Sequence, residues 1–284
     1  MTVAVTGATG KLGALVVREL LRTTDPGTIV AVVREPARAA DLAALGVRVR
    51  PATYADPQAL REAFAGVDDL LFISSSEAGQ RVDQHRNVID AALAAEVGRV
   101  VYTSAPRATT STLVLAPEHK FTEEYLTASG LPFTILRNNW YTENYLGQIE
   151  TARQTGTLVA AAGDGRVASA SRADFAAAAA VVLTQPGHEG RVYELGGDQA
   201  WDFTELATAL SAIIGAPVAY RSVDRPTLVG ILQQAGLDAG TAGFVAQLDD
   251  DIAQGALAEV TGELSKLIGR PTTPLLDGLR HAAG

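Results

Sequence analysis

The chain has 284 residues, 47% hydrophobic and 19% charged, which suits one large domain or two intimately joined ones. It contains no cysteine, and this excludes disulfides, cysteine-ligated metals and thiol catalysis. The formal net charge is −9 and no run of Lys and Arg is present, so nucleic acid is not expected as a partner.

Apolar strands and amphipathic helices alternate over residues 1–105. Short apolar runs predict strands at 3–7, 28–34, 47–54, 69–76 and 99–105. Helical periodicity predicts helices between them, at 11–23, 37–46, 57–67 and 84–98. Several of the strands are almost continuously apolar, as parallel strands covered on both faces are. The alternation therefore predicts an α/β fold with a Rossmann-type, doubly wound parallel sheet.

The second half of the chain is less regular. We expect helices at 117–130, 141–156, 172–185 and 203–215, strands at 132–137, 191–197 and 217–223, and a helical remainder. The acidic run Asp249–Asp251 is expected to lie on a solvated helix face. The predicted domains are a dinucleotide-binding domain, 1–140 together with 168–200, and a smaller, mainly helical substrate lobe, 141–167 and 201–284.

Three glycines, Gly7, Gly10 and Gly13, follow the first predicted strand and open the first helix. In that context the first glycine permits a tight turn, the second lets the backbone approach a pyrophosphate, and the third lets the helix pack closely on the strand. Backbone N–H groups and the positive end of the helix then face the anion. The alternative is an ordinary tight turn between a strand and a helix.

The end of the second strand indicates which dinucleotide binds. An NAD site usually has Asp or Glu there, whereas this sequence has Arg34, with Arg38 one turn further on. A guanidinium pairs with a 2′-phosphate, so we expect a preference for NADP(H). Glu35 is expected to face elsewhere. The alternative is that Arg34 is only a surface cation.

The usual catalytic pair of nucleotide-binding α/β enzymes is absent. None of the seven tyrosines is followed by lysine four residues later, which disfavours acid–base catalysis by a Tyr/Lys pair. The four histidines are far apart and show no ligand spacing, so no metal is expected. His119 is a candidate proton donor, although a histidine on a helix face is more often structural.

Polar and aromatic side chains gather directly after the strand at 132–137, in the segment 136–144. Ligands of open α/β sheets bind at this carboxyl edge. The amides could hold a nicotinamide carboxamide, and Trp140 and Tyr141 could form a flat apolar wall for an aromatic acceptor. The alternative is a hydrogen-bonded corner with a core tryptophan.

These motifs together resemble the NmrA-like, atypical short-chain dehydrogenase family. The resemblance rests on "TGATGKLG", "VVREPAR", "SSSEAGQR", "HRNVI", "YTS", "LRNNWYTENY" and "AAGDGRVASASRADFAAAAA", and extends through "GHEGRVYEL" and "SKLIGRPTT" over nearly the whole chain. Within that family, the chain is most similar to bacterial, flavin-free NAD(P)H:quinone oxidoreductases.

The resemblance implies direct hydride transfer from NADPH to a small aromatic quinone, with no flavin and no metal. It implies cofactor contacts from Gly7, Ala8, Thr9, Gly10, Lys11, Leu12, Arg34, Ser74, Ser75, Ser76, Asn138, Asn139, Trp140, Tyr141, Thr142, Glu143 and Ser169. Candidates for the substrate pocket are Trp140, Tyr141, Asn144 and His119. Two alternatives stay open: a non-catalytic NADP(H)-binding redox sensor that regulates a partner protein, and a reductase of azo or nitroaromatic compounds.

We also expect a cytoplasmic protein, monomeric or homodimeric. The N-terminus enters a predicted strand at once, without the charged and apolar segments of a signal peptide. No run of about 18 apolar residues is present to span a membrane.

Overall fold

The computed structural model describes residues 1–77 and 79–284, and these divide into two compact units. Unit 1 consists of Met1–Thr109, Pro117–Asn138 and Arg172–Glu194, and unit 2 of Thr110–Ala116, Asn139–Ser171 and Leu195–Gly284.

Unit 1 is built on a sheet that has seven strands among the described residues, in the order β3-β2-β1-β4-β5-β6-β9. The strands are β1 Val3–Thr6, β2 Ile29–Val33, β3 Arg48–Pro51, β4 Asp69–Phe72, β5 Arg99–Ser104, β6 Phe133–Asn138 and β9 Val192–Leu195. The pairs from β3 through β6 are all parallel. This arrangement confirms the predicted doubly wound α/β fold.

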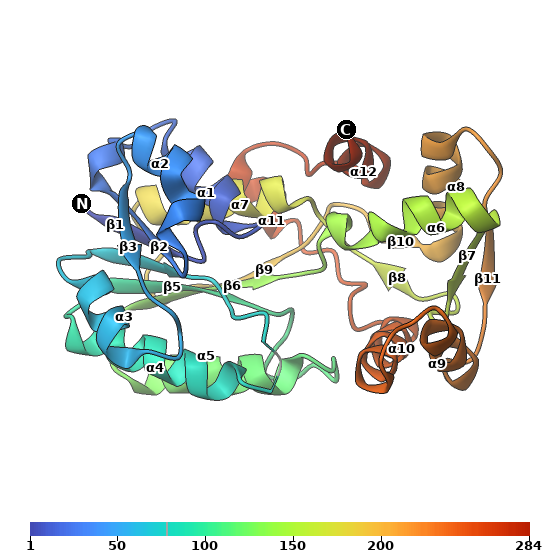
Figure 1. The fold of residues 1–284 in the computed structure, drawn as a ribbon, viewed down its shortest axis with the longest axis horizontal. Coiled ribbons are helices and arrows are strands. Elements are labelled where there is room, and N and C mark those ends of the chain that lie inside the picture. The colour runs from blue at the N-terminus through green and yellow to red at the C-terminus, as the bar shows by residue number, and fades with distance from the viewer. Residues whose placement is uncertain (78) are drawn as a thin grey trace. The chain divides into compact units, whose positions relative to one another are not determined.

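Helices cover both faces of this sheet (Figure 1). One layer holds α1 Gly13–Leu20, α2 Ala40–Ala44 and α7 Arg172–Thr184, and the other holds α3 Pro57–Phe64, α4 Arg81–Ala94 and α5 Ala116–Ala128. Because β1, β2, β4 and β5 are covered on both faces, every residue of these strands is buried. Among the largest fully buried side chains are Tyr102, Phe64 and Phe72.

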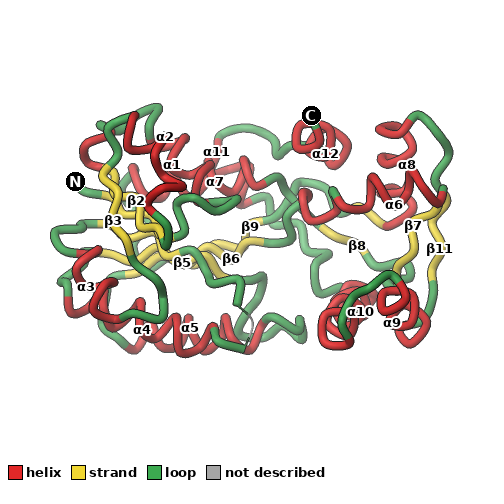
Figure 2. The backbone as a smooth tube through the Cα atoms, in the orientation of Figure 1, coloured by secondary structure: helices red, strands yellow, loops and turns green. Residues whose placement is uncertain are grey.

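Unit 2 carries two small sheets, seen as the separate short strands of Figure 2. In one, β7 Thr157–Ala160 pairs in parallel with β11 Ala219–Ser222, and in the other β8 Arg166–Val167 pairs antiparallel with β10 Trp201–Asp202. The helices are η3 Thr142–Tyr145, α6 Gly147–Thr155, α8 Phe203–Ile214, α9 Arg225–Gln234, α10 Ala239–Ala253, α11 Glu263–Ile268 and α12 Leu275–Ala283.

The expectation of one continuous helix over 141–156 was wrong. The helix predicted over 141–156 is divided, because Thr142 N donates to Ala170 O at 3.0 Å and Ala170 N donates to Trp140 O at 3.1 Å. These bonds hold the chain extended at Tyr141, and α6 begins only at Gly147. The strands β7, β8 and β10 were also not predicted.

The acidic run on α10 is not a solvated face. Asp251 is buried and accepts a hydrogen bond from Val114 N at 2.7 Å, and Asp249 accepts one from Ala161 N at 2.8 Å. Burial raises the pKa of Asp249 to about 6. These carboxylates therefore fasten α10 to neighbouring backbone segments by satisfying their N–H groups.

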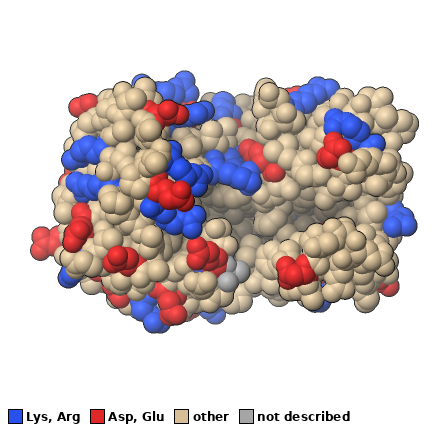
Figure 3. All heavy atoms as spheres, in the orientation of Figure 1, with Lys and Arg blue, Asp and Glu red and all other residues tan. Residues whose placement is uncertain are grey.

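Charges of both signs are mixed on the visible face of unit 1, where Lys and Arg side chains lie next to Asp and Glu side chains (Figure 3). Among the described residues, no helix combines the length and the apolar composition that a membrane crossing requires. Within the same residues, no group of three or more His, Asp and Glu side chains is placed to hold a metal ion.

Candidate functional site

The glycine loop of unit 1 has the compact shape that a dinucleotide requires. Gly7 has φ +58°, a conformation that side chains disfavour, and Gly10 N donates to Gly7 O at 2.8 Å. A Cβ on Gly13 would lie 2.2 Å from Gly7 O, so only glycine lets α1 start this close to β1. The residues present therefore fit a pyrophosphate at the start of α1.

The strand order locates the binding crevice. The chain runs outward from β1 to β2 and β3, and then returns to β4 on the other side of β1. Such a reversal is the switch point of a doubly wound sheet, and ligands bind outside the carboxyl ends of the strands there. The glycine loop follows β1 and the serines Ser74–Ser76 follow β4, so both flank the switch point.

Arg34 stands directly after β2, as the prediction of an NADP(H) site requires. Its side chain is 66% exposed, and its Nη1 lies 3.3 Å from Oε1 of Glu77. Glu77 in turn accepts a hydrogen bond from Gln84 Nε2 at 2.7 Å. The cation predicted to bind the 2′-phosphate is therefore exposed and paired with a carboxylate that follows β4.

The serines after β4 differ in their surroundings. Ser75 is buried: its N–H donates to Nε2 of His85 at 3.0 Å and its hydroxyl contacts Gln84. Ser74 is half-buried, and its N–H donates to Thr103 Oγ1 at 3.0 Å. Ser76 is exposed. Ser75 thus holds the loop in place, while Ser76 is open to solvent.

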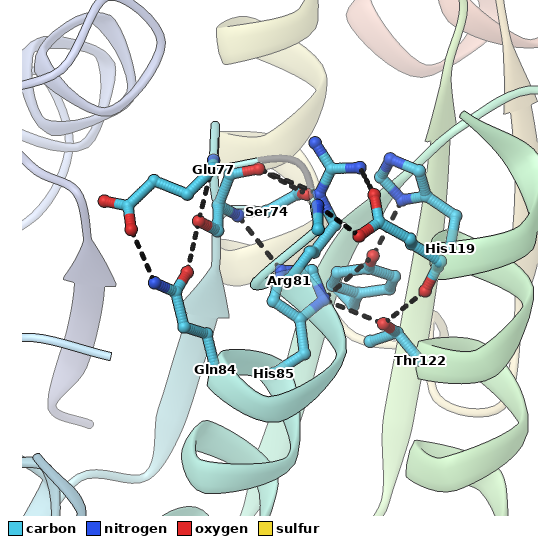
Figure 4. A network of polar contacts seen from close by, with 11 residues as sticks. Ser74, Glu77, Arg81, Gln84, His85, His119 and Thr122 are labelled. Atoms are coloured by element: carbon cyan, nitrogen blue, oxygen red, sulfur yellow. Dashed lines mark hydrogen bonds and ion pairs between the residues drawn. The ribbon is translucent and has the colours of Figure 1, made fainter. Parts of the chain in front are cut away.

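A network of polar side chains links this loop to α4, β5 and α5 (Figure 4). Arg81 is buried, donates from Nε to Ser75 O at 2.9 Å, and forms an ion pair with Glu118 at 2.6 Å. The other carboxylate oxygen of Glu118 accepts from Gly79 N at 3.0 Å. The segment after β4 is therefore held from both α4 and α5.

Two histidines and a tyrosine form the inner part of the network. His85 Nδ1 lies 2.7 Å from Thr122 Oγ1, and His119 Nδ1 lies 2.7 Å from the hydroxyl of Tyr102. Burial, with the nearby Arg81 guanidinium, lowers the pKa of His85 to about 2 and that of His119 to about 3. Burial also raises the pKa of Tyr102. All three groups are therefore neutral at physiological pH.

The chain passes from unit 1 to unit 2 between Asn138 and Asn139. Asn138 ends β6 and is buried. Asn139 is also buried; its Oδ1 accepts from Trp140 N at 2.6 Å and its Nδ2 donates to Leu257 O at 3.2 Å. The amide of Asn139 thus fastens the start of unit 2, and its predicted cofactor contact stays a prediction.

Thr142 and Ser169 contact each other inside unit 2, with their hydroxyl oxygens 2.9 Å apart. The indole Nε1 of Trp201 also donates to Ser169 Oγ at 2.9 Å. Tyr145, on the same turn as Thr142, packs edge-on against Trp201 with ring centroids 5.0 Å apart. These contacts give both hydroxyls a structural role beside the predicted cofactor contact.

The candidates for the substrate pocket fall in different units. Trp140 and Tyr141 are half-buried and Asn144 is exposed, all three in unit 2, whereas His119 is buried in unit 1. The sequence interpretation missed Arg81, His85 and Tyr102 altogether. All three lie in motifs that carry the family resemblance, "SSSEAGQR", "HRNVI" and "YTS", but no rule of spacing connects them.

The chain belongs to the NAD(P)H-binding family, whose model matches residues 7–186. This finding confirms the predicted class of protein, because the matched range holds the glycine loop, Arg34 and the strands β2 to β6.

Particular relatives are similar over their full length. Quinone oxidoreductase 2 of Escherichia coli is 50% identical over 279 residues, which is 98% of each chain. The crystal structure of the NADPH-dependent quinone oxidoreductase of Escherichia coli, complexed with NADPH, matches with a TM-score of 0.96 at 49% identity, covering 100% of both chains. The Citrobacter triphenylmethane reductase complexed with NADP(H) matches with a TM-score of 0.94 at 38% identity, covering 99% of this chain and 100% of that one.

Proposed function

We propose that this chain reduces quinones with NADPH, by direct hydride transfer from the nicotinamide and without flavin. The observation that carries the proposal is the 50% identity to quinone oxidoreductase 2, which runs over 98% of both chains. A second feature supports it: the compact glycine loop follows β1 and the exposed guanidinium of Arg34 follows β2, at the edge where doubly wound sheets bind dinucleotides.

The residues proposed to hold the cofactor are those around the switch point. The backbone from Gly7 to Leu12 would hold the pyrophosphate, and Arg34 would bind the 2′-phosphate. Ser74 and Ser76 would line the path of the dinucleotide beyond β4. When bound, NADPH supplies a hydride at its nicotinamide ring.

The contribution that we propose for the residues of this chain is to orient the acceptor against the nicotinamide. A quinone is a strong hydride acceptor, so most of the catalysis can come from holding the acceptor close to the nicotinamide. We propose that Trp140, Tyr141 and Asn144 contact the acceptor. A cytoplasmic location and a monomeric or homodimeric state belong to the same proposal.

The test is a steady-state assay with a panel of acceptors. The purified protein is mixed with NADPH and a benzoquinone, a naphthoquinone, an azo dye or a triphenylmethane dye, and the loss of reduced-cofactor absorbance is followed. We expect turnover with the quinones and a colourless purified protein. Tight NADPH binding without turnover of any acceptor would instead indicate a redox sensor, and a yellow, flavin-containing protein would contradict the direct transfer.

A further inference from the structure

The direction of hydrogen bonding in the inner network is set by one backbone amide. Ser75 N–H donates to Nε2 of His85 at 3.0 Å, and a backbone amide can only donate. Nε2 of His85 is therefore the unprotonated nitrogen. Because His85 is neutral, its single ring proton lies on Nδ1.

That proton fixes the next two bonds. His85 Nδ1–H donates to Thr122 Oγ1 at 2.7 Å and faces the hydroxyl of Tyr102 at 3.5 Å, while the Thr122 hydroxyl donates to Glu118 O at 2.8 Å. The hydroxyl proton of Tyr102 cannot point at a nitrogen that is itself protonated. The shortest contact of this hydroxyl among the described residues is with Nδ1 of His119 at 2.7 Å, and the hydroxyl proton is assigned to this bond.

His119 Nδ1 is therefore an acceptor, and the proton of this neutral imidazole lies on Nε2. Figure 4 shows the second ring nitrogen of His119 on the side of the ring that faces away from the hydroxyl of Tyr102. It makes no hydrogen bond to any residue that the structure describes, and it does not belong to the fully buried unpaired atoms. The network thus presents one oriented N–H donor at its outer end.

The ring that carries this donor is hydrogen-bonded to Tyr102 near the carboxyl end of β5, and doubly wound sheets bind their ligands at that edge. His119 is on the first turns of α5 and bonds to Tyr102 on β5. In the sheet, β5 lies next to β4, on one side of the switch point, whereas the adenine half of the dinucleotide is expected on the other side, at β1 and β2. We propose that His119 Nε2–H donates a hydrogen bond to the quinone oxygen that becomes negative during reduction, with Tyr102 and His85 as positioning residues. This inference rests on the proposed quinone reductase function.

His119 acts here as a neutral donor and keeps its proton. The charged and titratable groups that face it are Arg81 and His85 from α4, Tyr102 from β5 and Glu118 on its own helix, and burial with Arg81 holds its pKa near 3. Reduction of a quinone to a hydroquinone takes up one hydride and one proton; the hydride comes from NADPH and the proton from water. A neutral imidazole that polarises a carbonyl in this way is known enzyme chemistry.

Two variants separate the proposed Nε2–H donor of His119 from the hydrogen bond between its Nδ1 and Tyr102. In His119→Asn the amide matches the position of Nδ1, so Tyr102 keeps its acceptor while the outward donor is lost. In His119→Gln the amide nitrogen matches Nε2, so the outward donor is kept. We expect kcat/KM for the quinone to fall about 10- to 100-fold in His119→Asn and no more than about fivefold in His119→Gln.

The affinity for NADPH, measured by fluorescence titration, should stay within about twofold in both variants, because the donor serves the acceptor and not the cofactor. The loss in His119→Asn should also be constant from about pH 5 to about pH 8, since His119 does not titrate there. Three results would overturn the proposal. They are an equal loss of kcat/KM in both variants, a parallel loss of NADPH affinity, and a loss of kcat/KM in His119→Asn that disappears as the pH rises through the ordinary pKa of histidine.

The tautomer itself can be observed without turnover. In protein labelled with ¹⁵N-histidine, long-range ¹H–¹⁵N correlations should show His119 protonated at Nε2 and His85 at Nδ1. Tyr102→Phe removes the hydroxyl that fixes His119, and both tautomers should then be populated. An Nδ1-protonated His119 in an active wild-type enzyme overturns this inference alone, whereas a wild type that reduces no quinone removes the proposed function and with it the ligand named here.

Discussion

The guanidinium of Arg34 and the carboxylate of Glu77 form an ion pair across the carboxyl edge of the sheet, with Nη1 3.3 Å from Oε1. Arg34 follows β2, whereas Glu77 follows β4, so the pair spans the strand β1 that lies between them. A 2′-phosphate that binds to Arg34 carries more negative charge than Glu77 and competes with it for the same guanidinium. Arg34 and Glu77 should therefore have opposite effects on cofactor preference.

Replacing Arg34 by Ala should weaken NADPH binding about 10- to 100-fold and NADH binding little, because a charge-assisted contact to the 2′-phosphate is lost. The measurement is the KM and the dissociation constant for each cofactor. Arg22→Ala is the matched control, since Arg22 is similarly exposed and, among the residues that the structure describes, its ion pair is with Glu19 on α1. Equal effects on NADPH and NADH would remove the role of Arg34.

Replacing Glu77 by Gln should strengthen NADPH binding by up to about fivefold, since the phosphate no longer displaces an exposed ion pair. Glutamine at this position can still accept the hydrogen bond from Gln84, so the loop should keep its shape. NADH binding should stay unchanged. Weaker NADPH binding in Glu77→Gln, measured by the same titration, would show that the carboxylate does not compete for Arg34.

Replacing Gly13 by Ala should disrupt the dinucleotide loop, because the new Cβ would lie 2.2 Å from Gly7 O and only backbone could move away. We expect NADPH affinity to fall at least about tenfold and the protein to lose roughly 1–3 kcal/mol of stability. Gly230→Ala on α9 is the control, since a Cβ there meets nothing within 4 Å and should stabilise the helix by about 0.5–1 kcal/mol. A Gly13→Ala protein that binds NADPH normally would contradict the close packing of α1.

The neutral histidines should make stability depend on pH. The folded pKa of His119, about 3, lies below the value of about 6.5 for the unfolded chain, so its contribution is fully present above about pH 6.5 and is lost as pH falls toward about 3. When the pH falls from 7 to 5, the free energy of unfolding, measured with urea, should therefore decrease by about 1–2 kcal/mol less in His119→Asn than in the wild type. Equal losses in the two proteins would mean that His119 is protonated in the folded state.

The parts of the site that lie within one short segment could be predicted from the sequence. Gly7, Gly10 and Gly13 act through local backbone geometry, and Arg34 is placed by the end of its own strand. The fold followed from the alternation of apolar strands and helices, which depends on the same local patterns.

The His85–Tyr102–His119 network could not be predicted, because its members come from α4, β5 and α5 and meet only after the sheet has formed. In the sequence, Tyr102 resembles one more apolar residue of a buried strand. Similarly, Asp251 resembles a surface residue, since its partner Val114 N lies far away in the chain. A polar side chain whose partner is a distant backbone group gives no periodic signal.

A kinetic isotope effect is the most direct test of hydride transfer from NADPH to a quinone. NADPH that carries deuterium at one of the two faces of nicotinamide C4 is mixed with flavin-free protein and a naphthoquinone in a stopped-flow instrument. We expect a primary kinetic isotope effect on NADPH oxidation with one of the two labelled cofactors and none with the other. NADPH oxidation that requires added flavin, or that does not exceed the rate without protein, would contradict the proposed reaction.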